Sequence, residues 1–466
     1  MTFRSINPAT GAVLAEFPAL TAGEVDQRIA RAAAAAPRWR ATPVSERAAM
    51  VGRLGDLLES DKERLGRMMT LEMGKPIRAA VEEAAKCALA CHYYAEHGPS
   101  FVADQTVEDE GHRSFIAYDP LGVVLAVMPW NFPFWQAIRF MAPAFVAGNV
   151  GLLKHASNVP QCALELESLV RRAGAPDGVF QTLLIGADAV AGVLSDSRVA
   201  AATLTGSEGA GSSVAEVAGR NIKPTVLELG GSDPFIVMPS ADLGRAVETA
   251  VTARTINNGQ SCIAAKRFIV HDSIFDSFLG RFADGMQALR VGDPTDPATQ
   301  LGPLASARQA EELEDQVARS VKAGARLVCG GKRTDPRAAF FPATVLTDIP
   351  ESSPAWSDEL FGPVGCVFRA RDVDDAIRIA NSTRFGLGAS AWTTDPAEQE
   401  AFARGIDSGS VFVNDMVVSD PRFPFGGVKA SGYGRELSEL GLREFTNIKT
   451  VRIRRSGVPT TTSRTE

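Results

Sequence analysis

The 466-residue sequence lacks long runs of basic residues and long runs of apolar residues. Its 48 basic residues are balanced by 55 acidic ones, which leaves a formal net charge of −7 and no basic run suited to a polyanion. The longest apolar runs, such as residues 140–148, are about half of the roughly 20 residues that a membrane-spanning helix needs. We therefore expect neither nucleic acid nor a membrane among the partners of this protein.

Cysteine is scarce, with six residues that form no paired Cys-x-x-Cys sets. This pattern argues against a disulfide framework and a zinc site, so we predict no bound metal. The N-terminal segment lacks the charged-then-apolar pattern of a secretory signal, which predicts a cytoplasmic location. All but one of the cysteines are interpreted as small buried hydrophobic residues. The cysteines are Cys87, Cys91, Cys162, Cys262, Cys329 and Cys366.

The chain does contain a regular alternation of short apolar segments and helical patterns, and its length suits two or three domains. Thr21 and Glu24 form a capping box before a helical run to Ala36, and the first hundred residues are mainly helical. Residues 114–130 then indicate a strand, a turn and a second strand. Further strands alternate with helices, which predicts parallel sheets covered on both faces. The glycine pair at 230–231 marks the join between two such units.

Three residues are candidates for covalent chemistry. Cys262 ends the segment NNGQSC, where a helical pattern meets small and polar residues, so its thiol is a candidate nucleophile in a cleft. Glu228 is a carboxylate in an apolar strand, where burial raises a pKa towards general-base use. Asn131 lies between two prolines in PWNFP, which leaves its amide as a candidate oxyanion donor. Each residue alone also fits a structural role, as an inert cysteine, an ion-paired acid or a turn asparagine, so their context must decide.

The segment from Thr205 to Gly211, TGSEGAG, follows a predicted strand and opens a predicted helix. Backbone N–H groups at such a helix start can hold a pyrophosphate. The segment has no Gly-Lys-Ser/Thr sequence, which excludes a P-loop, and a tight turn alone also explains its glycines.

Together these motifs, in this order and spacing, resemble the aldehyde dehydrogenase superfamily. The resemblance extends from INPATG at residue 6 to FGGVKASGYGRE at residue 436, and its most specific segments are PWNFP, LLKHAS, TGSxxxG, LELGG, GQSC and ELFGPV. It implies an α/β fold with two parallel-sheet Rossmann-type domains and a small β oligomerisation element. Residues 1–99 and 118–229 would bind the cofactor, and 230–415 would form the catalytic domain. Residues 100–117 and 440–456 would form an oligomerisation hairpin and a C-terminal strand, followed by a polar tail at 457–466.

The resemblance also assigns roles to single residues. It implies that Cys262 is the nucleophile, Glu228 the general base, and Asn131 an oxyanion donor together with the Cys262 N–H. The cysteine would form a thiohemiacetal and then a thioester, which water activated by Glu228 would hydrolyse. The residues implied for NAD(P) binding are Trp130, Lys154, Ser157, Gly206, Ser207, Gly211, Glu359 and Phe361.

Within the superfamily, the segment GQSCIAAKR resembles the shorter bacterial succinate-semialdehyde dehydrogenases. This subgroup implies that Arg139 and Ser419 bind the distal carboxylate of the substrate and that Trp135 lines the same wall. Arg139 lies among apolar residues and needs an anionic partner, which from sequence alone is either the substrate or a protein carboxylate. A second arginine that some relatives carry is replaced here by Ile256.

The position three residues after Lys154 is commonly Glu in members that prefer NAD, and here it is Ser157. A neutral hydroxyl tolerates a 2′-phosphate, so we expect NADP, with NAD also accepted. The alternatives are another short semialdehyde or aliphatic aldehyde as substrate, a CoA-acylating enzyme, and a non-catalytic protein on the same fold. The resemblance further implies a homodimer or a homotetramer.

Overall fold

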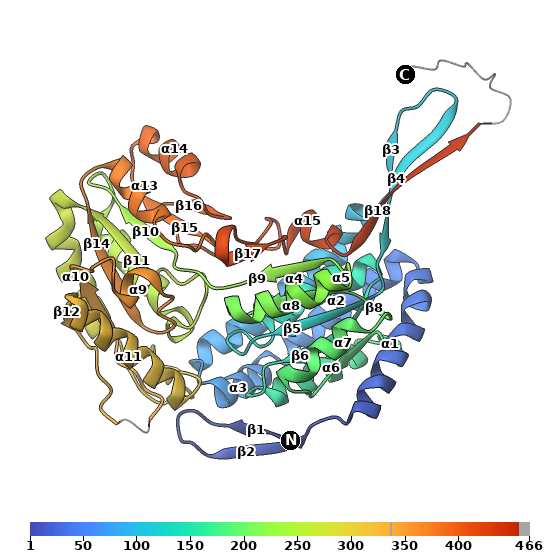
Figure 1. Cartoon of the computed structure of the whole chain (residues 1–466), viewed down its shortest axis with the longest axis horizontal. Helices are drawn as coiled ribbons and strands as arrows, with labels where there is room; N and C mark the ends of the chain where they lie inside the picture. The colour runs from blue at the N-terminus through green and yellow to red at the C-terminus, as the bar shows by residue number, and fades with distance from the viewer. Residues whose placement is uncertain (336–337, 456–466) are drawn as a thin grey trace.

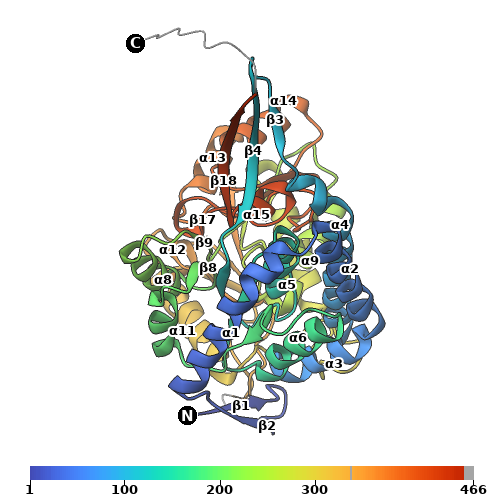
Figure 2. The ribbon, with the colours of Figure 1, turned by 90° about the vertical axis from the view of Figure 1, so that its right-hand side faces the viewer.

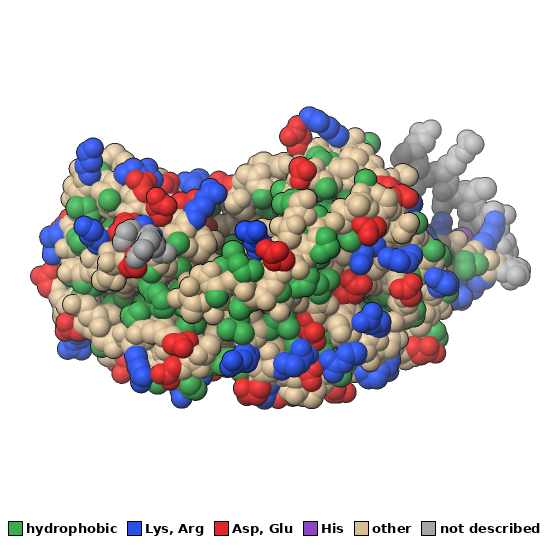
Figure 3. All heavy atoms as spheres, turned by 90° about the horizontal axis from the view of Figure 1, so that it is seen from below, with side chains coloured by type: hydrophobic (Ala, Val, Ile, Leu, Met, Phe, Trp, Pro, Cys, Tyr) green, Lys and Arg blue, Asp and Glu red, His purple; other side chains and the backbone are tan. Residues whose placement is uncertain are grey.

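The computed structural model describes residues 1–335 and 338–455, so the predicted polar tail lies outside the described residues. Two α/β lobes lie side by side, and a β-strand arm projects from one of them (Figures 1 and 2). Within the described ranges, no helix combines the length and the apolarity that crossing a bilayer requires. Charged side chains of both signs are interspersed over the face shown in Figure 3.

The first lobe contains a sheet with the strand order β17-β9-β8-β5-β6-β7. All neighbouring strands in it are parallel except β17, which pairs antiparallel with β9. Its central strands are almost wholly buried and apolar, as a sheet covered on both faces requires. The strands are β5 (Val123–Met128), β6 (Val150–His155), β7 (Phe180–Thr182), β8 (Val199–Thr205), β9 (Thr225–Glu228) and β17 (Gly432–Tyr433).

Helices from the first half of the chain cover this sheet, and the predicted capping box at Thr21 is confirmed at the start of the first one. The helices are α1 (Ala22–Ala41), α2 (Val44–Ser60), α3 (Lys62–Met73), α4 (Ile77–Phe101), α5 (Trp135–Ala147), α6 (Pro160–Arg172), α7 (Val190–Ser195) and α8 (Glu208–Arg220); α15 (Ser438–Arg443) contacts α4 and α5. The first hundred residues are mainly helical, as predicted, but they also contain a hairpin that was not predicted, formed by β1 (Thr2–Ile6) and β2 (Val13–Pro18).

The second lobe contains a sheet with the order β12-β13-β14-β11-β10-β15-β16, parallel except for β12 at its edge. The strands are β10 (Pro234–Val237), β11 (Arg267–His271), β12 (Arg326–Cys329), β13 (Thr344–Thr347), β14 (Val364–Ala370), β15 (Ala389–Trp392) and β16 (Val411–Val413). The helices are α9 (Leu243–Thr255), α10 (Phe275–Gln287), α11 (Ala307–Ala323), α12 (Pro354–Ser357), α13 (Val373–Asn381) and α14 (Pro396–Gly405). The predicted α/β class with parallel sheets is confirmed.

The projecting arm is a sheet of order β18-β4-β3, formed by β3 (Gln105–Val107), β4 (His112–Pro120) and β18 (Thr446–Arg454). The strand, turn and strand expected over residues 114–130 exist, but they belong to different sheets: β4 joins the arm and β5 joins the first lobe. Ile448 and Ile453 are exposed on the arm, which leaves apolar side chains uncovered in the isolated chain.

A buried ion pair fixes the start of α5, the helix that follows Asn131. The Glu83 carboxylate pairs with the Lys75 ammonium, and both side chains are almost fully buried. The same carboxylate accepts hydrogen bonds of 3.0 Å from the backbone N–H groups of Phe134 and Trp135. Glu83 therefore satisfies orphan donors at the N-terminus of α5 and ties that helix to α4.

We expect Glu83→Gln to destabilise the protein by about 3–5 kcal/mol, because it leaves the Lys75 ammonium buried without a counter-charge. The matched control is Glu82→Gln, one position earlier on the exposed face of α4. Urea unfolding followed by circular dichroism should give a clearly lower midpoint for Glu83→Gln alone. Equal midpoints for the two variants would contradict the role given to this pair.

Candidate active site

A sharp backbone turn after α9 carries the chain to Cys262. Asn257, Asn258 and Gly259 all have positive φ angles, of 53°, 59° and 75°. A Cβ atom at Gly259 would lie 2.3 Å from the backbone of Gly362, so only glycine fits there. The Asn258 side chain donates to the carbonyls of Gly74 and Pro303, each at 2.9 Å, which compensates for its strained backbone.

Two buried cations hold the segment around the cysteine. The Lys266 ammonium donates to the carbonyl oxygens of Ser261, Cys262 and Ala264 at 2.8, 3.0 and 3.1 Å. The Arg254 guanidinium donates to the carbonyls of Gly259 and Ala265. Within the described residues, the Cys262 N–H makes no hydrogen bond to protein, so this donor remains available.

Asn131 lies against the same segment. Its side-chain N–H2 donates to the Gln260 carbonyl at 3.1 Å, and its Oδ1 accepts from the Gln136 amide at 3.0 Å. These two bonds fix which end of the amide faces the Cys262 segment. Since an amide nitrogen has two hydrogens, one N–H of Asn131 is still free to donate towards the cavity that it lines.

Cys262 and Gln136 both line two cavities. The larger cavity has a volume of about 560 Å³, and side chains of both lobes surround it. The smaller has a volume of about 170 Å³. Burial raises the pKa of the Cys262 thiol to about 12, and the nearby Arg139 charge opposes this shift. The thiol thus lies where ligands entering from two directions would meet.

The larger cavity contains several of the residues expected to bind the cofactor. Trp130, Gly206, Ser207, Glu359 and Phe361 line it. The Trp130 and Phe361 rings meet edge to face, with centroids 5.8 Å apart. The Ser207 hydroxyl caps α8 by accepting from the Ala210 N–H, and the Glu359 carboxylate accepts from the Gly231 N–H at 3.1 Å.

Other expected cofactor residues lie outside this lining. Lys154 is half-buried at the end of β6, and Ser157 is exposed on the loop that follows. Gly211 is buried in the first turn of α8, where a Cβ atom would lie 2.7 Å from the Leu229 side chain. This glycine therefore permits close packing of α8 against the strand that ends at Glu228.

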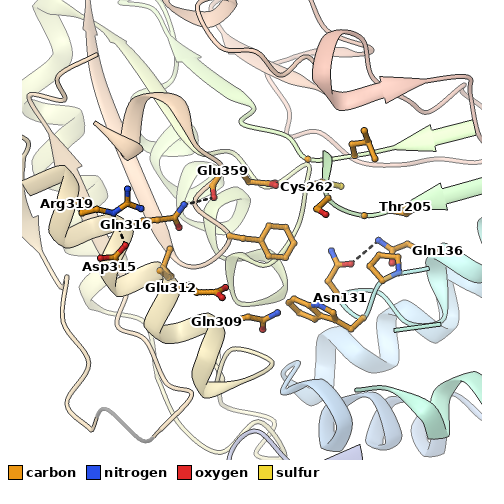
Figure 4. Close-up of a pocket in the computed structure, with 18 residues that line it drawn as sticks. Asn131, Gln136, Thr205, Cys262, Gln309, Glu312, Asp315, Gln316, Arg319 and Glu359 are labelled. Carbon is orange, nitrogen blue, oxygen red and sulfur yellow. Dashed lines mark hydrogen bonds and ion pairs between the residues drawn. The ribbon is translucent and has the colours of Figure 1, made fainter. Parts of the chain in front are cut away.

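Sequence reasoning missed the polar face of α11, which forms the opposite wall of the larger cavity (Figure 4). The spacing of these residues places them on one side of the helix, but the sequence does not indicate what that side faces. The α11 residues that line the cavity are Gln309, Glu312, Leu313, Asp315, Gln316 and Arg319.

The smaller cavity brings together Trp135, Arg139 and Ser419, as expected. Ile256 lines it as well, and so does Lys86, which sequence reasoning missed. Arg139 forms a buried ion pair with Glu436 and donates to Thr205 Oγ1 at 3.3 Å. The structure thus gives Arg139 a protein carboxylate as partner, which is one of the two alternatives left open by the sequence.

Glu228 is buried at the end of β9 and is not part of the lining of either cavity. Within the described residues, neither of its carboxylate oxygens has a hydrogen-bond partner. Burial raises its pKa well above the usual range, and the neighbouring Glu436 adds to this effect. A carboxyl group with a raised pKa is suited to proton transfer.

The remaining cysteines are mostly buried, as predicted, but Cys329 is half-buried on the edge strand β12. The expectation of full burial was wrong for this residue, because an edge strand has a neighbour on one side only.

The family model for the aldehyde dehydrogenase family matches residues 1–451. The chain belongs to the aldehyde dehydrogenase family. This aldehyde dehydrogenase is 57% identical over 454 residues to an NADP-dependent succinate-semialdehyde dehydrogenase of Mycobacterium tuberculosis. The matched region covers 97% of this chain and 99% of the relative. A Mycobacterium avium protein of the same name is also 57% identical, over 97% of this chain and 96% of its own length.

Among solved structures, a succinic semialdehyde dehydrogenase from Streptococcus pyogenes in complex with NADP+ superimposes with a TM-score of 0.95. It is 37% identical and covers 97% of this chain and 100% of its own. The comparisons confirm the predicted fold and the predicted general activity, NAD(P)-dependent oxidation of an aldehyde.

We expect Cys262→Ala to abolish aldehyde oxidation by this aldehyde dehydrogenase while leaving its unfolding midpoint nearly unchanged. The thiol lines two cavities, so its removal enlarges existing space and creates no new void in a packed core. Cofactor reduction and thermal unfolding would be measured on the same preparation. Retention of more than about a few per cent of the wild-type turnover would rule out Cys262 as the nucleophile.

Proposed function

We propose that this enzyme oxidises succinate semialdehyde to succinate with NADP, and uses NAD as well. The observation that carries the proposal is the position of Cys262 between a large cavity, lined by aromatic and polar groups, and a small, mainly apolar cavity. The charged residues of the small cavity are Lys75, Glu82, Glu83, Lys86 and Arg139, and all of them except Lys86 and Glu82 are ion-paired within the described part of the protein. A short aldehyde with a distal carboxylate fits the small cavity in size and charge. The names of the mycobacterial and streptococcal relatives support this choice.

The residues of the larger cavity fit a dinucleotide. Trp130 and Phe361 offer flat apolar surfaces, and the N-terminus of α8 at Ser207 offers backbone donors for a pyrophosphate. Glu359 offers a carboxylate that would accept from ribose hydroxyls. The close approach of α8 to Leu229 at Gly211 is the packing that such a site needs. When bound, NADP supplies a nicotinamide that accepts a hydride.

The chain's own residues account for the other steps. The Cys262 thiol gives its proton to water, and the thiolate attacks the aldehyde carbon and forms a C–S bond. The resulting oxyanion accepts from the Cys262 N–H and the Asn131 amide. Loss of hydride from that carbon leaves a thioester. Glu228 then takes a proton from water, the hydroxide attacks the acyl carbon, and the C–S bond breaks to release the acid. Rotation of the Glu228 side chain towards Cys262 breaks no hydrogen bond of the described residues, since its carboxylate makes none.

We expect Glu228→Gln to lower steady-state turnover by about 10²–10⁴-fold while a first burst of NADPH persists. The acyl-enzyme still forms in this variant, but its hydrolysis lacks a base. Because the raised pKa of Glu228 places its proton loss at higher pH, wild-type turnover should increase as pH rises through that pKa. Stopped-flow absorbance measures both phases, and undiminished steady-state turnover would remove Glu228 from the mechanism.

Selection of the cofactor is assigned to Ser157, which is exposed directly after β6 and carries no charge. We expect the wild-type enzyme to use NADP at least as well as NAD. Ser157→Glu should shift the preference towards NAD by tenfold or more, because the new carboxylate would repel the 2′-phosphate of NADP. A tenfold shift corresponds to a repulsion of about 1.4 kcal/mol. The ratio of kcat/KM for the two cofactors measures this, and strong NAD selectivity in the wild type would contradict it.

We propose that the protein assembles through the arm, whose exposed Ile448 and Ile453 would be covered in a homodimer or homotetramer.

We also propose that residues 1–99 and 118–229 form the cofactor-binding domain and that residues 230–415 form the catalytic domain. We further propose that the enzyme works in the cytoplasm.

A further inference from the structure

Lys86 lines the smaller cavity together with Cys262, although no motif of the sequence points to it. It lies in α4, and its ammonium donates to the Ser419 hydroxyl at 2.7 Å. The same ammonium lies 4.4 Å from the centroid of the Trp135 ring. These two contacts, from the loop after β16 and from α5, hold the cation in a fixed direction at the cavity wall.

The other cations around this cavity are already balanced within the protein. Arg139 is paired with Glu436, and Lys75 is paired with Glu83. Lys86, in contrast, forms no ion pair within the described residues. The same holds for Glu82, an exposed carboxylate one turn earlier on α4 that also lines this cavity. Asp420, beside Ser419, pairs with Arg422.

A half-buried cation without a protein counter-ion favours an anionic ligand. The wall around it is otherwise largely apolar, with Ile256, Ile263 and Phe425 among the lining residues. These side chains would accommodate a short methylene chain between the reacting aldehyde carbon at Cys262 and a distal anionic group.

We propose that the Lys86 ammonium binds the distal carboxylate of the aldehyde substrate and so determines which aldehydes the enzyme prefers. The inference rests on the proposed function, since it concerns how succinate semialdehyde is selected. Ser419 and Trp135 act as positioning residues for this ammonium. Arg139 contributes to the wall and to the field around Cys262, with its own charge balanced by Glu436.

The titration of Lys86 gives this role a signature that an arginine lacks. Burial lowers the pKa of its ammonium to about 8, and the Arg139 charge on α5 acts in the same direction. Cys87 and Glu83 on α4 and Asp420 on the loop after β16 oppose the shift. The ammonium is charged below this pKa and neutral above it. Attraction for a carboxylate is therefore present at lower pH and is lost as pH rises through about 8, whereas a guanidinium stays charged throughout.

The test compares kcat/KM for succinate semialdehyde with kcat/KM for butanal, from about pH 6.5 to about pH 9.5. The ratio of the two values cancels the pH dependence of the shared chemistry at Cys262 and Glu228. In the wild type we expect a ratio well above one that declines above the Lys86 pKa. Lys86→Met should lower the ratio at neutral pH by at least about tenfold and remove its pH dependence.

Lys86→Arg should keep a high ratio but lose the decline at alkaline pH, which a purely structural role of Lys86 would not produce. The matched control, Lys322→Met at the exposed end of α11, should behave as the wild type. If Lys86→Met retains the wild-type ratio, or if Lys86→Arg retains the alkaline decline, Lys86 is not the carboxylate ligand. If the wild type itself does not prefer succinate semialdehyde to butanal, the proposed substrate is wrong and this inference falls with it.

Discussion

The ammonium of Lys266 lies beneath the loop that carries Cys262, where its three hydrogens meet the carbonyls of Ser261, Cys262 and Ala264. Burying this charge is unfavourable unless every donor is satisfied, so these three hydrogen bonds stabilise both the buried lysine and this arrangement of the loop. Lys266 also lies 3.4 Å from the Glu359 carboxylate. The same buried cation thereby connects the Cys262 loop to the wall of the larger cavity.

Because of this arrangement, residues of both lobes surround the Cys262 sulfur. With the carbonyls of the loop turned towards buried cations, the Cys262 N–H has no acceptor among the described residues. Asn131 reaches the loop from the first lobe, at the start of a segment that Glu83 anchors. The two lobes therefore contribute different parts of one site, Asn131 from the first and Cys262 from the second, and Cys262 lies where the two cavities meet.

The sequence predicted what depends on local pattern. Buried apolar strands, the capping box at Thr21 and the motif segments around Asn131, Glu228 and Cys262 could all be recognised without the structure. The ion-pair partners of buried charged residues could not be predicted, because they are distant in the chain. Arg139 and Glu436 are an example: burial required a counter-ion, but only the folded chain shows which one. The polar face of α11 and the position of Lys86 likewise follow from how helices pack, which side-chain spacing does not specify.

The central claim is that Cys262 carries the acyl group between oxidation and hydrolysis. It is tested most directly by mixing Glu228→Gln enzyme with succinate semialdehyde and NADP, quenching in acid, and mapping peptides by mass spectrometry. The account predicts one succinyl group, bound as a thioester to the peptide that contains Cys262. An unmodified Cys262 peptide at a time when a stoichiometric amount of NADPH has formed, or an acyl group on another cysteine, would contradict it.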